Sequence, residues 1–231
     1  KEQIVKEAQD NEIICGLINT IDEAMDNNPQ ADFREYFVDI DREIVGKLRY
    51  PGAPIHSPRG WWQINSPAPL LGEHNKEILE AGWRSEKANS SSNLISSSGS
   101  TKKLPLECIR VLDITLALAG PYAAMFLADM GAEIIRLEPR SFIPLGGRGQ
   151  SARPDPELEK NALTSLYPDR DPGNRPWNRS SGFNTMARNK RSITVELATE
   201  EGRDIVRRLV EVSDIFLLNS APGAMDRLGL G

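Results

Sequence analysis

A short run of small and apolar residues is the first feature of this sequence that could do chemistry. Residues 115–120 (TLALAG) follow an apolar strand pattern and lead into a helix pattern in which Pro121 suits the first position. Small side chains let the backbone approach a phosphate or a thioester carbonyl, and a helix amino terminus favours an anion. The pattern G-x-G-x-x-G is absent from this turn, which counts against a nicotinamide or flavin site but not against another nucleotide.

Three other groups of residues are weaker candidates. Gly146–Gly149 (GGRG) is rich in glycine but lies deep in a long loop, so it is weak evidence for a phosphate cradle. Arg188, Lys190 and Arg191 form a basic knot before a strand. Such a knot is usually a solvated turn, although at a ligand-binding edge it would attract a diphosphate. Asp113 is the obvious carboxylate of the first strand, and its apolar flanks favour a structural role as a hydrogen-bond acceptor.

The cysteines and histidines predict no metal site. Cys15 and Cys108 are isolated from each other, and His56 and His74 add no spacing typical of metal ligands. Each cysteine lies in an apolar stretch, so we expect both to be buried, reduced thiols of an intracellular protein.

The residues from 104 onward predict an α/β domain with a doubly wound parallel sheet. Strands are expected at 109–114, 133–137, 193–197 and 215–218, and helices at 122–130, 199–212 and 221–228. Gly131 suits a left-handed helix end, and the first strand, helix and strand should form a right-handed βαβ unit. Ligands of such sheets bind at the carboxyl ends of the strands, so the loops at 115–120, 138–141 and 219–222 should converge there.

The first 86 residues have a different, mixed α+β pattern. Helices are expected at 3–8, 21–25 and 73–81, and paired strands at 36–40 and 46–50. Asn19 or Thr20 can cap the second helix, and five prolines between residues 51 and 69 favour an extended path. We expect this segment to pack on the α/β domain, because a Pro-rich segment of this size has a marginal core and a parallel sheet needs cover on both faces.

Residues 87–103 separate these two parts. Serines and asparagines here surround only two large apolar residues, Leu94 and Ile95. Such a stretch cannot bury enough surface to offset the entropy of ordering it. We interpret it as a flexible linker between residues 1–86 and residues 104–231; the alternative is a long surface loop within one domain.

Several motifs, in the right order, resemble a class III coenzyme A transferase of the CaiB/BaiF family. The opening of that family resembles LECIRVLDITLALAGPYAAMFLADMGAEIIRLE (106–138), NKRSITVEL (189–197), EGRDIVRRLVEVSDIFLLN (201–219) and PGAMDRLGLG (222–231). The carboxyl end of the family instead resembles ICGLINTIDEA (14–24), LRYPGAPI (48–55) and PAPLLGEHNKEIL (67–79). The resemblance therefore implies the end of one unit followed by the beginning of a second.

This resemblance implies an enzyme that moves coenzyme A from an acyl-CoA to a small carboxylic acid through an aspartyl intermediate, with no permanently bound cofactor. The implied CoA contacts are Ala117, Leu118, Ala119, Arg140, Val195, Glu196, Leu197, Ala198, Asn219, Ser220, Ala221 and Arg227. The family's nucleophilic aspartate would lie beyond Gly231, so no catalytic residue is assigned. Members often carry a polar residue at the position of Leu118, an arginine at Pro139 and a basic residue at Ala198, so the polar contacts differ here.

The resemblance also implies a partner, a second unit of the same family in the same chain or in an interlocked homodimer. Two alternatives share the same opening motifs: a 2-methylacyl-CoA racemase and a non-catalytic CoA-binding scaffold. A formal net charge of −5 gives no basis for binding nucleic acid or an anionic membrane. No apolar run approaches the roughly 20 residues of a membrane span. We expect an intracellular protein, first of all cytoplasmic, with the mitochondrion and the peroxisome as alternatives.

Overall fold

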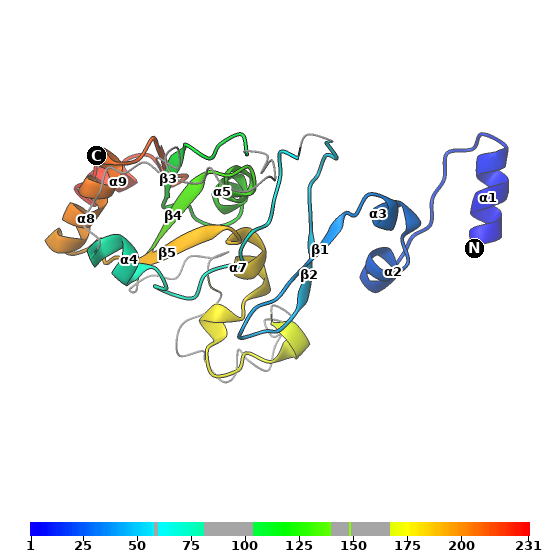
Figure 1. Ribbon diagram of the computed structural model, residues 1–231, viewed down its shortest axis with the longest axis horizontal. Coiled ribbons are helices and arrows are strands. Elements are labelled where there is room, and N and C mark those ends of the chain that lie inside the picture. The colour runs from blue at the N-terminus through cyan, green and yellow to red at the C-terminus, as the bar shows by residue number, and fades with distance from the viewer. Residues whose placement is uncertain (58–59, 81–103, 140–147, 149–166) are drawn as a thin grey trace, which may run out of the picture.

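A four-stranded parallel sheet forms the centre of the α/β domain, on the left in Figure 1. The computed structural model describes residues 1–57, 60–80, 104–139, 148 and 167–231. The strands are β3 (Arg110–Asp113), β4 (Glu133–Glu138), β5 (Lys190–Thr194) and β6 (Ile215–Leu217), in the spatial order β5-β4-β3-β6. All three neighbouring pairs are parallel. The predicted α/β class with a parallel sheet is confirmed.

Helices cover both faces of this sheet. One face packs against α5 (Ala119–Asp129) and α7 (Ser181–Met186), and the other against α4 (Asn75–Glu80), α8 (Glu200–Glu211) and α9 (Ala224–Arg227). Alternation along the strands explains the two layers. Leu112 and Ile135 point into the core under α8, whereas Val111 and Ile134 pack with the small residues of α5.

The N-terminal segment (residues 1–80) begins with short helices and a hairpin. The elements are α1 (Glu2–Asp10), α2 (Ile21–Asp26), α3 (Pro29–Phe33), and the antiparallel strands β1 (Phe37–Ile40) and β2 (Leu48–Pro51). Thr20, one of the two residues predicted to cap this helix, is the N-cap of α2 and forms a capping box with Glu23. In Figure 1, α1 lies far from the parallel sheet, and neither α1 nor α2 contains a buried residue.

The N-terminal segment covers the open edge of β5 with side chains instead of a strand. The backbone N–H of His74 donates to Ser192 O (3.0 Å), and the N–H of Ser192 donates to His74 Nδ1 (3.2 Å). The N–H of Thr194 donates to Asn75 Oδ1 (2.8 Å), and Asn75 Nδ2 donates to Thr194 Oγ1 (2.7 Å). Each of these two side chains therefore takes over hydrogen bonds that a further strand would make.

The same segment also packs on the α/β domain at other places. Asn189 Oδ1 accepts the backbone N–H groups of Asn65 and Ser66, at 2.7 and 2.9 Å. Ile78 and Leu79 of α4 pack against the core under α8. The expectation that the N-terminal segment packs on the α/β domain is confirmed, with contacts that begin at Ile44 and Pro51 and continue to Leu79.

Helix α5 and strand β5 have different bounds from those predicted from the sequence. Helix α5 begins at Ala119, so Pro121 is its third residue and not its first. The proline is tolerated there because the first four N–H groups of a helix have no partner within it. Strand β5 spans Lys190–Thr194 and not 193–197. Its beginning was missed because Lys190 and Ser192 are buried polar residues that hide the strand pattern.

Other predictions also need correction. Helix α9 has only four residues, since Gly223 (φ 73°) is left-handed at its N-cap. The sequence did not predict α7, whose N-cap is Ser180, or the 3₁₀ helices η2 (Pro168–Arg170) and η3 (Pro176–Asn178). The expected burial of the cysteines is wrong: Cys15 is half-buried and Cys108 is exposed in the turn before β3.

Three predictions fall outside the described residues: the linker at 87–103, the CoA contact at Arg140, and Gly146–Gly149 apart from Arg148.

Across the part of the chain that the structure describes, no helix has the length and apolar character needed to span a membrane.

Asn75→Ala is predicted to lower the free energy of unfolding by about 1–2 kcal/mol, because it removes both hydrogen bonds to Thr194. Chemical denaturation followed by circular dichroism measures this loss. Lys76→Ala, which changes an exposed residue of the same helix, is the matched control and should have little effect. Equal stability of both variants would contradict the covering role of Asn75.

Candidate functional site

The loops that follow β3 and β6 meet at the carboxyl edge of the sheet. Asn219 Oδ1 accepts the backbone N–H of Leu116 (2.7 Å), and Asn219 Nδ2 donates to Leu116 O (2.8 Å). This double hydrogen bond joins residues 103 positions apart in the sequence. The structure thus brings two predicted contact groups together, Ala117–Ala119 and Asn219–Ala221.

The turn between β3 and α5 leaves the helix amino terminus open. Ala117 adopts a left-handed conformation (φ 58°), and Ala117, Leu118 and Ala119 are all exposed. Leu118 is the N-cap of α5 and makes no side-chain capping hydrogen bond. Gly120 permits close packing, because a Cβ there would lie 2.3 Å from the Cβ of Thr115. The uncapped helix start favours an anion at this edge.

The loop after β5 reaches the same edge but offers little side-chain surface. Val195 and Leu197 are buried in the core under α8, so contacts predicted at these residues can involve only their main chain. Glu196 is half-buried, and its carboxylate accepts the N–H of Ala198 (3.3 Å). Of the four contacts predicted in this loop, only Glu196 and Ala198 therefore offer side-chain surface to a ligand.

The loop after β6 contains two further predicted contacts with polar side chains. The hydroxyl of Ser220 is buried and has no hydrogen-bond partner. A buried hydroxyl without a partner beside Asn219 is a position where a ligand group can complete the hydrogen bonding. Arg227 is exposed on α9, next to the left-handed Gly223, and its guanidinium is accessible to a phosphate.

A buried polar strip lies below this edge, on the sheet face that α5 and α7 cover. The strip consists of Asp113, Arg136, Glu138, Arg148, Lys190 and Ser192. Asp113 accepts hydrogen bonds from Lys190 Nζ (3.0 Å) and Arg136 Nη1 (3.2 Å). It also accepts the N–H (2.9 Å) and the hydroxyl of Thr115 in the β3–α5 loop. The predicted structural role of Asp113 is confirmed, and its two cationic partners are additional.

Burial and charge act against each other at this ion pair. Burial alone would raise the pKa of Asp113, but Lys190, Arg136 and the hydrogen bonds from Thr115 outweigh it and hold the pKa below 3.8. Burial lowers the pKa of Lys190 from 10.5 to about 8, although Asp113 opposes the change. The network fixes the end of β3 and the start of the loop that follows it.

Arg148 closes the other end of the buried polar strip. Its Nε and Nη2 each lie 2.7 Å from a different carboxylate oxygen of Glu138. Its Nη1 donates to Asn178 Oδ1 (2.8 Å), and its guanidinium lies 3.9 Å from the centre of the Phe183 ring. This buried two-point ion pair is structural, and it gives no support to a phosphate cradle at this arginine.

The basic knot is neither a solvated turn nor a part of the ligand-binding edge. Arg188 is buried and pairs with Asp129 at 2.7 Å, and Lys190 is buried in the polar strip. Arg191 pairs with Glu133 and lies near the amino end of β5, opposite to the loops described above. Both interpretations of the knot are therefore wrong, because all three cations have carboxylate partners.

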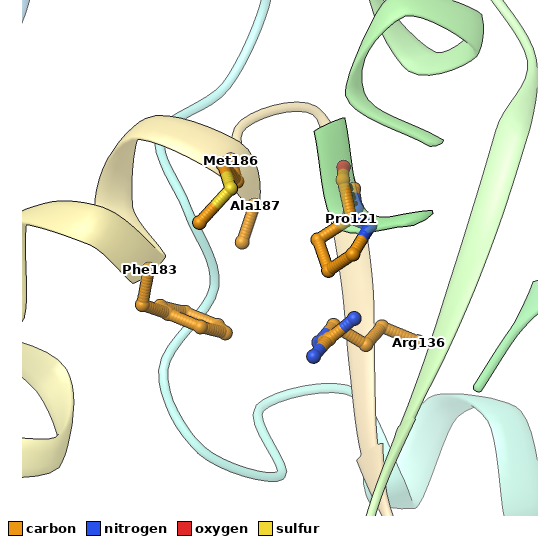
Figure 2. A pocket seen from close by; sticks show the side chains of 6 residues that line it. Pro121, Arg136, Phe183, Met186 and Ala187 are labelled. Carbon is orange, nitrogen blue, oxygen red and sulfur yellow. Dashed lines mark hydrogen bonds between the residues drawn. The ribbon is translucent and has the colours of Figure 1, made fainter. Parts of the chain in front are cut away.

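A narrow gap lies between α5, α7 and the strands β4 and β5 (Figure 2). Its lining residues are Pro121, Arg136, Phe183, Met186, Ala187 and Lys190. Figure 2 shows Arg136 extending between Pro121 and the Phe183 ring. The gap has no room for a water molecule, so it is not a ligand site. Within the described ranges, no group of His, Cys, Asp and Glu residues is arranged to hold a metal ion.

Comparison with known proteins gives matches along most of the chain. The model of a protein family described as CoA-transferase family III matches residues 1–75 and 106–231. The succinyl-CoA–D-citramalate CoA-transferase of Chloroflexus aurantiacus is 37% identical over 55% of this chain and 26% of its own length. The succinyl-CoA–L-malate CoA-transferase alpha subunit of the same organism is 33% identical over 79% of this chain and 34% of its own length.

A solved structure gives a match of similar extent. A CAIB/BAIF family protein from Brucella suis is 30% identical, with a TM-score of 0.43, over 56% of this chain and 29% of that chain. The present chain spans about a quarter to a third of the length of the curated relatives described here.

Asp113→Asn is predicted to destabilise the fold by about 3–5 kcal/mol, because it leaves Lys190 and Arg136 as buried cations without a counter-ion. Lys190→Met should cost less, about 1–3 kcal/mol, since Asp113 keeps Arg136 and Thr115 as partners. Urea denaturation of both variants tests this order. A larger loss for Lys190→Met would show that the charge balance is not the controlling factor.

The ion pair also predicts the acid sensitivity of the fold. Because the pKa of Asp113 is lowered in the folded state, its contribution to stability is present above the unfolded value of 3.8. That contribution is lost as the pH falls below this value and through the folded pKa. Stability measured from about pH 5 to about pH 2 should therefore fall less steeply in Asp113→Asn than in the parent chain. Parallel curves would contradict this assignment.

Proposed function

This chain belongs to CoA-transferase family III, and from that premise we propose that its α/β domain binds the coenzyme A part of an acyl-CoA. The enzyme to which it contributes would transfer this CoA to a small carboxylic acid. The observation that carries the proposal is the double hydrogen bond between Asn219 and Leu116. It holds the loop after β6 beside the uncapped start of α5, at the edge where parallel sheets bind nucleotides.

Each part of this edge suits a different part of coenzyme A. The main-chain N–H groups at Ala117–Ala119 suit a phosphate oxygen, and Arg227 suits a second phosphate. The free hydroxyl of Ser220 suits an amide of the pantetheine arm. Asn219 is a positioning residue, since both ends of its amide are already bonded to Leu116.

Transfer through an aspartyl intermediate requires a carboxylate that attacks the thioester carbonyl, so that the CoA thiolate leaves as a mixed anhydride forms. Asp113 does not suit this role, because it is fully buried and paired with two cations. No residue of the chain is assigned as the nucleophile. The aspartyl intermediate is therefore proposed from family membership alone.

The proposed protein partner is a second unit of the same family, with residues 1–86 as the end of one unit and residues 104–231 as the beginning of another. Support comes from large apolar side chains that the described residues leave uncovered on the N-terminal segment. Ile14, Ile18 and Phe33 are 102%, 93% and 85% exposed. Exposed apolar surface of this kind favours a protein contact. The intracellular location expected from the sequence stays a prediction.

Coenzyme A is predicted to bind the chain, and Arg227→Gln should raise the dissociation constant about tenfold through the loss of one charged phosphate contact. Isothermal titration calorimetry with CoA measures both values. Arg34→Gln removes an exposed arginine of the N-terminal segment and should bind CoA like the parent chain. No saturable binding of CoA by the parent chain would contradict the proposed function.

A further inference from the structure

One buried arginine differs from every other buried cation in the described residues. The buried cations are Arg42, Arg136, Arg148, Arg188 and Lys190. Four of them lie within 3.2 Å of a carboxylate oxygen of Asp113, Glu138 or Asp129. Arg42 has no carboxylate partner among the residues that the structure describes.

Arg42 lies in the turn between β1 and β2, and only 4% of its surface is exposed. Its Nη2 donates a long hydrogen bond to Pro69 O (3.4 Å). Its Nε and Nη1 are buried and have no hydrogen-bond partner. Burial lowers its pKa to about 10. The guanidinium thus carries a buried charge and unsatisfied donors.

A second guanidinium lies close to this one. Arg148 Nη2 donates to the same carbonyl oxygen, Pro69 O, at 3.1 Å. Both oxygens of Glu138 are already bonded to Arg148. The carboxylate of Glu73 interacts with Arg42 at longer range, but it accepts the backbone N–H of Leu70 (2.6 Å). The cluster around Pro69 O therefore holds two guanidiniums and two carboxylates, and the contacts of these carboxylates leave Nε and Nη1 of Arg42 without an acceptor.

We propose that Arg42 is the anchor of a binding site for the carboxylate of a small organic acid. The unsatisfied N–H groups match the planar oxygens of a carboxylate. Tyr50 is buried near Arg42 and can donate its hydroxyl to the same anion, since burial raises its pKa and keeps it protonated. One carboxylate group of such an acid carries a single charge and suits this buried site better than a phosphate group, which carries nearly two charges at neutral pH and loses more hydration energy.

Succinate is the probe, added to the whole 231-residue chain without CoA at neutral pH and constant ionic strength. The unfolding temperature of the parent chain should rise by about 3–5 °C at ten times the dissociation constant. Arg42→Met should show no saturable rise, and without succinate it should unfold at or above the temperature of the parent chain. Arg34→Met, which removes an exposed arginine, should respond like the parent chain.

Three results would overturn the proposal: no response of the parent chain, an equal response of Arg42→Met, or tighter binding of phosphate than of succinate. Should Arg42→Met fail to fold, Arg42→Lys provides the second test by titration calorimetry. It keeps the charge but loses the planar fork, so succinate should bind at least about tenfold more weakly. Unchanged affinity in Arg42→Lys would also reject the site. CoA binding is measured separately, so failure here leaves the proposed function intact.

Discussion

The buried carboxylate of Asp113 is the interaction on which the rest of the α/β domain depends. It lies at the end of β3 and is bonded to Arg136 of β4 and Lys190 of β5, so a single acidic group joins three parallel strands. Its hydrogen bonds from Thr115 also hold the start of the loop that leads to α5. A low-dielectric interior makes this attraction strong and makes the loss of either sign of charge costly.

The two faces of the sheet explain which elements the sequence could predict. Strands β3 and β4 were predictable because apolar residues such as Leu112 and Ile135 fill the face under α8. The beginning of β5 was not, since Lys190 and Ser192 look like surface residues until their partners on other strands are known. Helix α7 was missed because six residues with one Gly and one Asn give no helical period.

The candidate site was predictable as a place but not as a set of side chains. Topology alone puts the loops after β3, β5 and β6 at one edge, and the structure agrees. The bonding of Asn219 to Leu116 depends on a contact between distant parts of the chain, which no local pattern encodes. Likewise, the inward direction of Val195 and Leu197 follows from how the loop leaves β5.

The cover on β5 has a consequence for how this protein meets its neighbours. The main-chain hydrogen bonds between two strands form with almost any sequence, so the register of the strands can slip. His74 and Asn75 instead bond to β5 through their side chains, which fixes one register. A strand of another molecule therefore cannot pair with β5 unless it displaces the side chains of His74 and Asn75. Among the described residues the opposite edge is β6, which has only three residues and offers a very short template for pairing with another strand.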